Sequence, residues 1–107
     1  DIIYGGTTSA DSHITGDMII EDDVFISVLV SSTNDNTMGR DEYSENHVRG
    51  PHIKRGVTIG ASSILLPNII IGENSLIGAG SIVTKNIPND EVWIGSPARF
   101  IRKIKND

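Results

Sequence analysis

Three histidines and the pair Asn34-Asp35 are the side chains of this sequence best able to do chemistry. His13, His47 and His52 can each act as a general base or bind a metal ion. Asn34 can donate or accept a hydrogen bond, and the Asp35 carboxylate can take a proton. An Asn-Asp pair also forms ordinary turns, and many histidines are ordinary surface residues, so the surrounding chain must decide between these roles.

The elements that would position these side chains follow a six-residue repeat. From Ile53 to Val83 every sixth residue is aliphatic, and the residue four positions after each of these is small or aliphatic. The first set is Ile53, Ile59, Leu65, Ile71, Ile77 and Val83, and the second is Val57, Ser63, Ile69, Ser75, Ser81 and Ile87. The same phase runs through Ile14, Ile20 and Ile26 near the N-terminus.

A six-residue period predicts a parallel β-helix. Each unit supplies one short strand and one bend, three units close a triangular coil, and the aliphatic residue points inward above its counterpart three units away. An α-helix is excluded, because residues six apart fall on different faces of a helix. Gly60, Gly72 and Gly78 directly follow three of the aliphatic residues, and we expect them at bends whose backbone conformation disfavours a Cβ atom.

Two segments leave this pattern. The residues at about 33–52 are polar and lose the six-residue phase, which predicts a loop extruded from the β-helix. In the tail, Pro97 stands at a typical first helical position and is followed by apolar Phe100, Ile101 and Ile104. We therefore expect an all-β chain with a β-helix over residues 1–96 and a short capping helix over residues 97–107.

Composition narrows the range of partners. The formal net charge of -5 argues against a nucleic-acid partner, and the absence of cysteine excludes disulfides and thiolate metal sites. The sequence has neither a long apolar run nor a start that resembles a signal peptide. These features predict a soluble, cytoplasmic protein with no membrane partner.

Two motifs carry a family resemblance that extends over nearly the whole chain. IGAGSIVTK at residues 77–85 and GSPAR at residues 95–99 resemble the hexapeptide-repeat acyltransferases, whose fold is a left-handed parallel β-helix. The resemblance implies a homotrimer with active sites between neighbouring subunits and acetyl-CoA as co-substrate. Thr33-Asn34-Asp35 is similar to the enzymes that acetylate the amino group of nucleotide-linked amino sugars, so the expected acceptor is a small-molecule amino sugar.

The resemblance also implies roles for individual residues. Asn34 would orient the attacking group, and Asp35 or His52 would assist removal of its proton. For the donor, small residues would let the pantetheine arm approach the backbone closely, and cations would contact the phosphates of CoA. The small residues are Ala61, Ala79 and Gly80, and the cations are Lys85, Arg99 and Lys103.

Three alternatives remain open at this level. The first is an O-acetyltransferase that acts on a sugar hydroxyl, which needs a general base more than an amine does. The second is similarity to the γ-class carbonic anhydrases, in which His13, His47 and His52 would hold zinc; the expected acyltransferase has no metal site. The third is a binding or scaffold protein without activity, a hypothesis prompted by the irregular Ser27 and Ser32.

Overall fold

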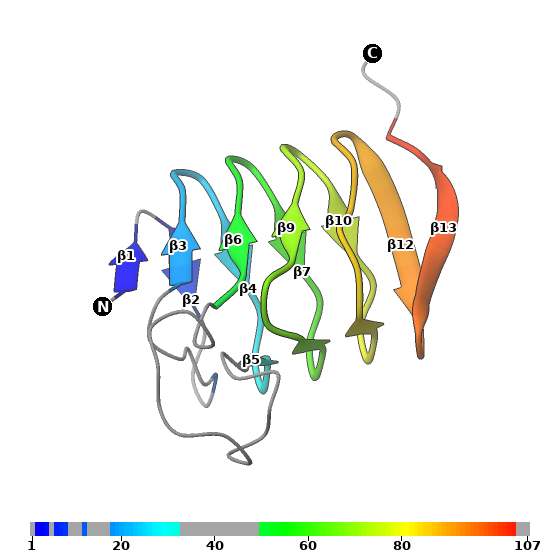
Figure 1. Cartoon of the computed structure of the whole chain (residues 1–107), viewed down its shortest axis with the longest axis horizontal. Helices are drawn as coiled ribbons and strands as arrows, with labels where there is room; N and C mark the ends of the chain where they lie inside the picture. Colours follow the sequence, from blue (N-terminus) through cyan, green and yellow to red (C-terminus); the bar gives the residue numbers. More distant parts are fainter. Residues whose placement is uncertain (1, 5, 9–11, 13–17, 33–49, 105–107) are drawn as a thin grey trace.

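The chain forms three sheets of short strands wound around one axis, as seen in a computed structural model (Figure 1). The structure describes residues 2–4, 6–8, 12, 18–32 and 50–104. Within these residues, each strand pairs in parallel with strands of the neighbouring coils, with one antiparallel exception at the C-terminal end. This all-β arrangement is consistent with the predicted left-handed β-helix.

Each sheet collects strands from successive coils, and β13 is an additional strand at the end of the second sheet. The first sheet has the order β1 (Ile2–Tyr4), β3 (Met18–Ile20), β6 (His52–Ile53), β9 (Ile70–Ile71). The second runs β13 (Ala98–Lys103), β12 (Glu91–Gly95), β10 (Leu76–Ile77), β7 (Thr58–Ile59), β4 (Phe25–Ile26), β2 (Thr7–Thr8). The third is β11 (Ile82–Val83), β8 (Ile64–Leu65), β5 (Ser31–Ser32).

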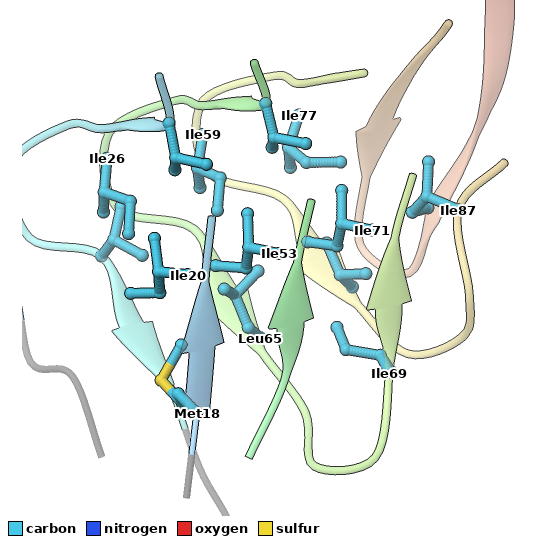
Figure 2. Close-up of a cluster of buried hydrophobic side chains, with 14 of the residues drawn as sticks. Met18, Ile20, Ile26, Ile53, Ile59, Leu65, Ile69, Ile71, Ile77 and Ile87 are labelled. Atoms are coloured by element: carbon cyan, nitrogen blue, oxygen red, sulfur yellow. The ribbon is translucent and has the colours of Figure 1, made fainter. Parts of the chain in front are cut away.

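The six-residue repeat is a burial pattern, as predicted. Both repeat positions from Ile53 to Ile87 are buried, and Ile20 and Ile26 continue the inner columns towards the N-terminus. Register explains the stacking, because Ile20, Ile53 and Ile71 are paired successively in the first sheet. Figure 2 shows these side chains meeting inside the coils. Each buried isoleucine contributes about 2–3 kcal/mol of transfer free energy, repeated along the axis.

The expected reason for the glycines is wrong. Gly60 has no positive φ; instead a Cβ atom on Gly60 would lie 2.6 Å from the backbone nitrogen of Ala79 in the next coil. The left-handed conformation belongs to other residues, which include a set spaced six apart: Gly56, Ser62, Asn68, Asn74 and Gly80. Asparagine tolerates this conformation, so the corners do not require glycine. Gly60 is therefore needed for close approach of successive coils.

The predicted C-terminal helix is also wrong for the described part of the tail. Residues Ala98–Lys103 form β13, which pairs antiparallel with β12. The physical reason is that β12 ends the stack and leaves a row of unpaired backbone groups, which β13 satisfies. Phe100 and Ile101, the apolar residues that suggested a helix, stay 49% and 53% exposed. The described residues contain no helix long and apolar enough to cross a membrane.

The predicted extruded segment falls at the corner between the third sheet and the first. The chain leaves the described coils after Ser32 at the end of β5 and returns at Gly50. His52, expected at the end of the loop, already belongs to β6. Residues 33–49, which include Asn34, Asp35 and His47, lie outside the described residues, as does His13.

Candidate functional site

His52 lies on the outer face of the first sheet. It precedes the buried Ile53 in β6, so the alternation of a strand points its side chain away from the core. Its backbone neighbours in the sheet are Ile19 of β3 and Ile70 of β9, both of which are exposed. The histidine therefore stands between two apolar side chains on an accessible surface.

A hydrogen-bonded carboxylate fixes the imidazole of His52. Its Nε2 atom lies 2.6 Å from Oε2 of Glu21, and the two side chains are 32% and 35% exposed. The other carboxylate oxygen, Oε1, accepts a hydrogen bond from the backbone N–H of Arg55 at 3.1 Å. The hydrogen bond to His52 is the main cause that holds the pKa of Glu21 below its ordinary value, and the Arg55 N–H acts in the same direction against the effect of partial burial.

Glu21 was not identified from the sequence. A signal was present: Glu21 follows Ile20, His52 precedes Ile53, and the repeat assigns Ile20 and Ile53 to the same inner column. If the extruded segment is left out when the coils are aligned, Glu21 and His52 fall on adjacent strands. The pair can hold a histidine in one orientation, which is what a general base requires.

The three small residues predicted to contact the donor are brought together. Ala61, Ala79 and Gly80 lie at the corner between the second and third sheets in successive coils, and the Gly80 N–H donates to the Ala61 carbonyl oxygen at 2.8 Å. We call these three residues the small-residue ridge. Gly80 has open space around it, because a Cβ atom added there would meet no heavy atom within 4 Å.

Backbone donors on this ridge are open. Among the described residues, the N–H groups of Ala61 and Ala79 have no acceptor. At the corner between the first and second sheets the corresponding donors are occupied: Arg55 N–H binds Glu21, and Glu73 N–H donates to Oδ1 of Asn89 at 2.7 Å. The ridge thus combines small side chains with donors available to a bound molecule.

Of the three predicted phosphate contacts, Arg99 and Lys103 lie on β13 of the C-terminal hairpin, and Lys85 lies between β11 and β12. Arg99 is paired with Ile94, and Ile94 lies over Gly78 next to the ridge. Lys103 is paired with Glu91 at the other end of β12, about 10 Å away at a strand rise of about 3.3 Å per residue. Lys85 places its Nζ atom 5.8 Å from the centre of the Trp93 ring, a cation–π contact. Only Arg99 is placed beside the ridge.

His52 and the small-residue ridge lie on opposite sides of the coil. The first sheet, which carries His52, is one side of the triangular cross-section, whereas the ridge is the corner where the other two sides meet. One copy of the chain therefore does not bring its own histidine to its own ridge. The described residues also contain no group of three or more side chains able to hold a metal ion, and two of the three histidines of the zinc alternative lie outside them.

Comparison with known proteins identifies a matching family and a similar enzyme. Residues 50–85 match the family described as bacterial transferase hexapeptide (six repeats). A serine acetyltransferase of Buchnera aphidicola subsp. Schizaphis graminum is 45% identical over 88% of this chain and 36% of its own length. The chain thus spans about a third of the length of this relative.

Solved structures agree with the sequence comparison. A serine acetyltransferase of Neisseria gonorrhoeae matches 98% of this chain and 39% of its own chain, with a TM-score of 0.82 and 29% identity. A Brucella abortus serine acetyltransferase in complex with coenzyme A matches 98% of this chain and 42% of its own, with a TM-score of 0.74 and 31% identity. These relatives favour the predicted alternative of O-acetylation and give no support to an amino-sugar acceptor.

Proposed function

We propose that this chain, whose residues 50–85 match the bacterial transferase hexapeptide family, is the left-handed β-helix of an acetyl-CoA-dependent O-acetyltransferase. The proposed acceptor is the hydroxyl group of a small amino acid, with serine as the first candidate. Similarity to serine acetyltransferases, one of them solved with coenzyme A, supports both the donor and the acceptor.

The observation that carries this proposal is the hydrogen-bonded pair of His52 and Glu21. A neutral amine attacks a thioester without strong activation, whereas a hydroxyl group needs a base to take its proton. A histidine held by a carboxylate on an accessible face suits the second reaction. This chemistry favours a hydroxyl acceptor over the amino group of a sugar.

The reaction would proceed by direct transfer. His52 takes the hydroxyl proton as the acceptor oxygen attacks the carbonyl carbon of the thioester, and the carbon–sulfur bond then breaks. The departing thiolate of CoA receives the proton from the imidazolium, which restores neutral His52. Alignment of the two substrates supplies up to about 7–11 kcal/mol of the barrier reduction.

The donor would lie along the small-residue ridge. The open N–H groups of Ala61 and Ala79 are able to bind the amide and thioester oxygens of the pantetheine arm. Arg99, beside the C-terminal end of the ridge, would meet the phosphates. Lys85 and Lys103 keep their predicted role as further cations for the phosphates.

The active site would be shared between copies of the chain. Because His52 and the ridge lie on opposite sides of one coil, a donor on the ridge of one copy needs the histidine of another. A homotrimer, in which each copy contributes both surfaces, satisfies this requirement. Asn34 and Asp35 keep their predicted roles of orienting the acceptor and assisting proton removal.

Release of the CoA thiol tests the proposed function. Serine should give turnover with acetyl-CoA, and a nucleotide-linked amino sugar should not. A His52→Gln substitution should lower kcat roughly 100-fold or more, the usual contribution of a general base. Thr58→Ala, at the matching outward position of β7, serves as the control and should keep its turnover. Amino-sugar turnover with no serine turnover would refute the assigned acceptor, and full activity of His52→Gln would refute the assigned base.

A further inference from the structure

The two ring nitrogens of His52 have different surroundings. Nε2 lies 2.6 Å from Oε2 of Glu21, and an ionised carboxylate can only accept a hydrogen bond. The lowered pKa of Glu21 keeps that carboxylate ionised at neutral pH. The shared proton therefore resides on Nε2 of the neutral ring, which leaves the lone pair on Nδ1.

We propose that Glu21 is a positioning residue that holds His52 in its Nε2–H form, so that Nδ1 is the atom that takes the proton of the acceptor. The assignment rests on the proposed function and deepens it by naming the reacting nitrogen. Glu21 touches neither substrate nor donor in this arrangement, and it acts through the imidazole.

The fold holds the pair rigidly. Glu21 follows Ile20 and His52 precedes Ile53, and these two isoleucines are paired and almost fully buried. The Glu21 N–H donates to the Ile53 carbonyl oxygen at 2.9 Å, and the His52 N–H donates to the Ile69 carbonyl oxygen at 2.9 Å. Both backbones are thus fixed in the coil ladder, so the side chains meet across neighbouring coils without a loop rearrangement.

A second contact fixes the carboxylate itself. Oε1 of Glu21 accepts from the Arg55 N–H at 3.1 Å, which leaves Oε2 directed at the ring. Both carboxylate oxygens therefore have a donor. When Nδ1 gains the acceptor proton, the imidazolium charge forms directly against this carboxylate. The same proton leaves from Nδ1 to the departing thiolate, so the cycle closes with Nε2–H unchanged.

Nitrogen NMR of ¹⁵N-histidine-labelled protein reads the tautomer directly, with His52→Gln used to assign the signal of His52 among the three histidines. In the wild type, Nδ1 should be unprotonated and Nε2 protonated once the ring is neutral. Glu21→Ala should give a mixture of tautomers. Glu21→Gln should keep the wild-type tautomer, because the amide oxygen still accepts from Nε2–H.

Steady-state kinetics then distinguish a role of Glu21 in positioning His52 from a role in stabilising the fold. Glu21→Ala should lower kcat about 10- to 100-fold, the range found when a partner that orients a metal-ligating histidine is removed, and leave the KM for acetyl-CoA unchanged. The kcat of Glu21→Gln should lie between that of the wild type and that of Glu21→Ala. Asp22→Asn removes a neighbouring negative charge from an exposed side chain of the same corner and should leave kcat unchanged.

Several results would overturn the assignment. A proton on Nδ1 in the wild type contradicts the proposed reacting atom, and full kcat in Glu21→Ala contradicts the role of Glu21. A fall in kcat of Glu21→Ala with an unchanged tautomer in that variant indicates a structural role instead. A wild type without turnover on any hydroxyl acceptor refutes the proposed function, and the tautomer measured on that same sample shows separately whether Glu21 controls the ring.

Discussion

Two glycine-to-alanine substitutions should have clearly different effects on stability, because the two glycines meet different constraints. Gly60 has an ordinary φ but little space: a Cβ atom would lie 2.6 Å from the Ala79 backbone nitrogen and 2.9 Å from the Ile77 carbonyl oxygen. Gly80 has a left-handed φ of 72° but no neighbour within 4 Å. Gly60→Ala therefore tests coil spacing, and Gly80→Ala tests backbone conformation.

The expected losses can be estimated separately. Ordinary contact begins near 3.4 Å, so Ala79 must move by 3.4 − 2.6, or about 0.8 Å, to admit the Gly60 methyl group. That shift works against the hydrogen bond from the Gly60 N–H to the Ile77 carbonyl oxygen at 2.8 Å, and overpacking of this kind costs about 1–3 kcal/mol or more. For Gly80→Ala, about 1–2 kcal/mol of left-handed strain is offset by about 0.4–1 kcal/mol from the stiffer unfolded chain.

Urea unfolding followed by far-UV circular dichroism measures the difference, at one fixed protein concentration because association adds to apparent stability. We expect Gly60→Ala to lose about 1 kcal/mol more than Gly80→Ala. At an m-value of about 2 kcal/mol per molar urea, its midpoint lies about 0.5 M lower. Equal midpoints, or a larger loss for Gly80→Ala, would show that conformation and not close approach sets the need for glycine in these coils.

Three further outcomes are expected. Leu29 has a φ of 60° and is 55% exposed, so Leu29→Asn should raise the free energy of unfolding by about 1 kcal/mol in thermal melts; a loss would mean that another molecule covers this side chain. Since the pKa of Glu21 is lower in the folded chain than its ordinary 4.5, its contribution to stability is present above that pH and lost as the pH falls through the folded value. Glu21→Gln should flatten this acid limb in pH-dependent melts, and an unchanged limb would contradict the hydrogen bond between Glu21 and His52. Gly80→Ala should also raise the KM for acetyl-CoA several-fold with little change in kcat, because the added methyl group stands on the open ridge; an unchanged KM in steady-state assays would argue against donor binding there.

The coils could be predicted from the sequence because their period directly records burial. Ile53, Ile59 and Leu65 are aliphatic because their side chains are buried in the core, and the same pattern recurs in each repeat. Ser63 follows the same pattern: it is small and fully buried, and its hydroxyl group donates to the Gly78 carbonyl oxygen at 3.2 Å. Because the coils repeat, the local six-residue pattern is enough to predict how they stack, whereas an irregular fold would require knowledge of contacts between residues distant in the sequence.

The tail was mispredicted because its outcome depends on the end of the stack. Phe100, Ile101 and Ile104 have spacings that fit a helix, and nothing local distinguishes that helix from a strand. The unpaired backbone of β12 decides the matter, and this edge exists only once the coils have formed. Local propensity was overridden by a tertiary requirement for hydrogen bonds.

The candidate site was predicted in parts for a related reason. Ala61, Ala79 and Gly80 lie together because they share one corner of the repeat, and the six-residue period indicates that shared corner. The partnership of Glu21 with His52 crosses an interruption of the repeat, and register across such an interruption is not evident from local spacing. Asn34 and Asp35, the residues predicted to orient the acceptor and assist proton removal, lie outside the repeat, and the repeat gives no information about them.

A triangular coil imposes a geometric rule on any chemistry that it carries. Outward side chains on one sheet cannot reach the opposite corner of the same coil, because the filled core separates them. A reaction between a molecule held by the small-residue ridge and a base at His52 must therefore use two copies of the chain. In a closed ring, every copy presents its histidine to one neighbour and its ridge to the other, so each site is complete without any change in the fold. On this argument the subunit arrangement is a requirement of the proposed catalysis, and a variant that folds but does not associate should bind acetyl-CoA weakly and transfer nothing.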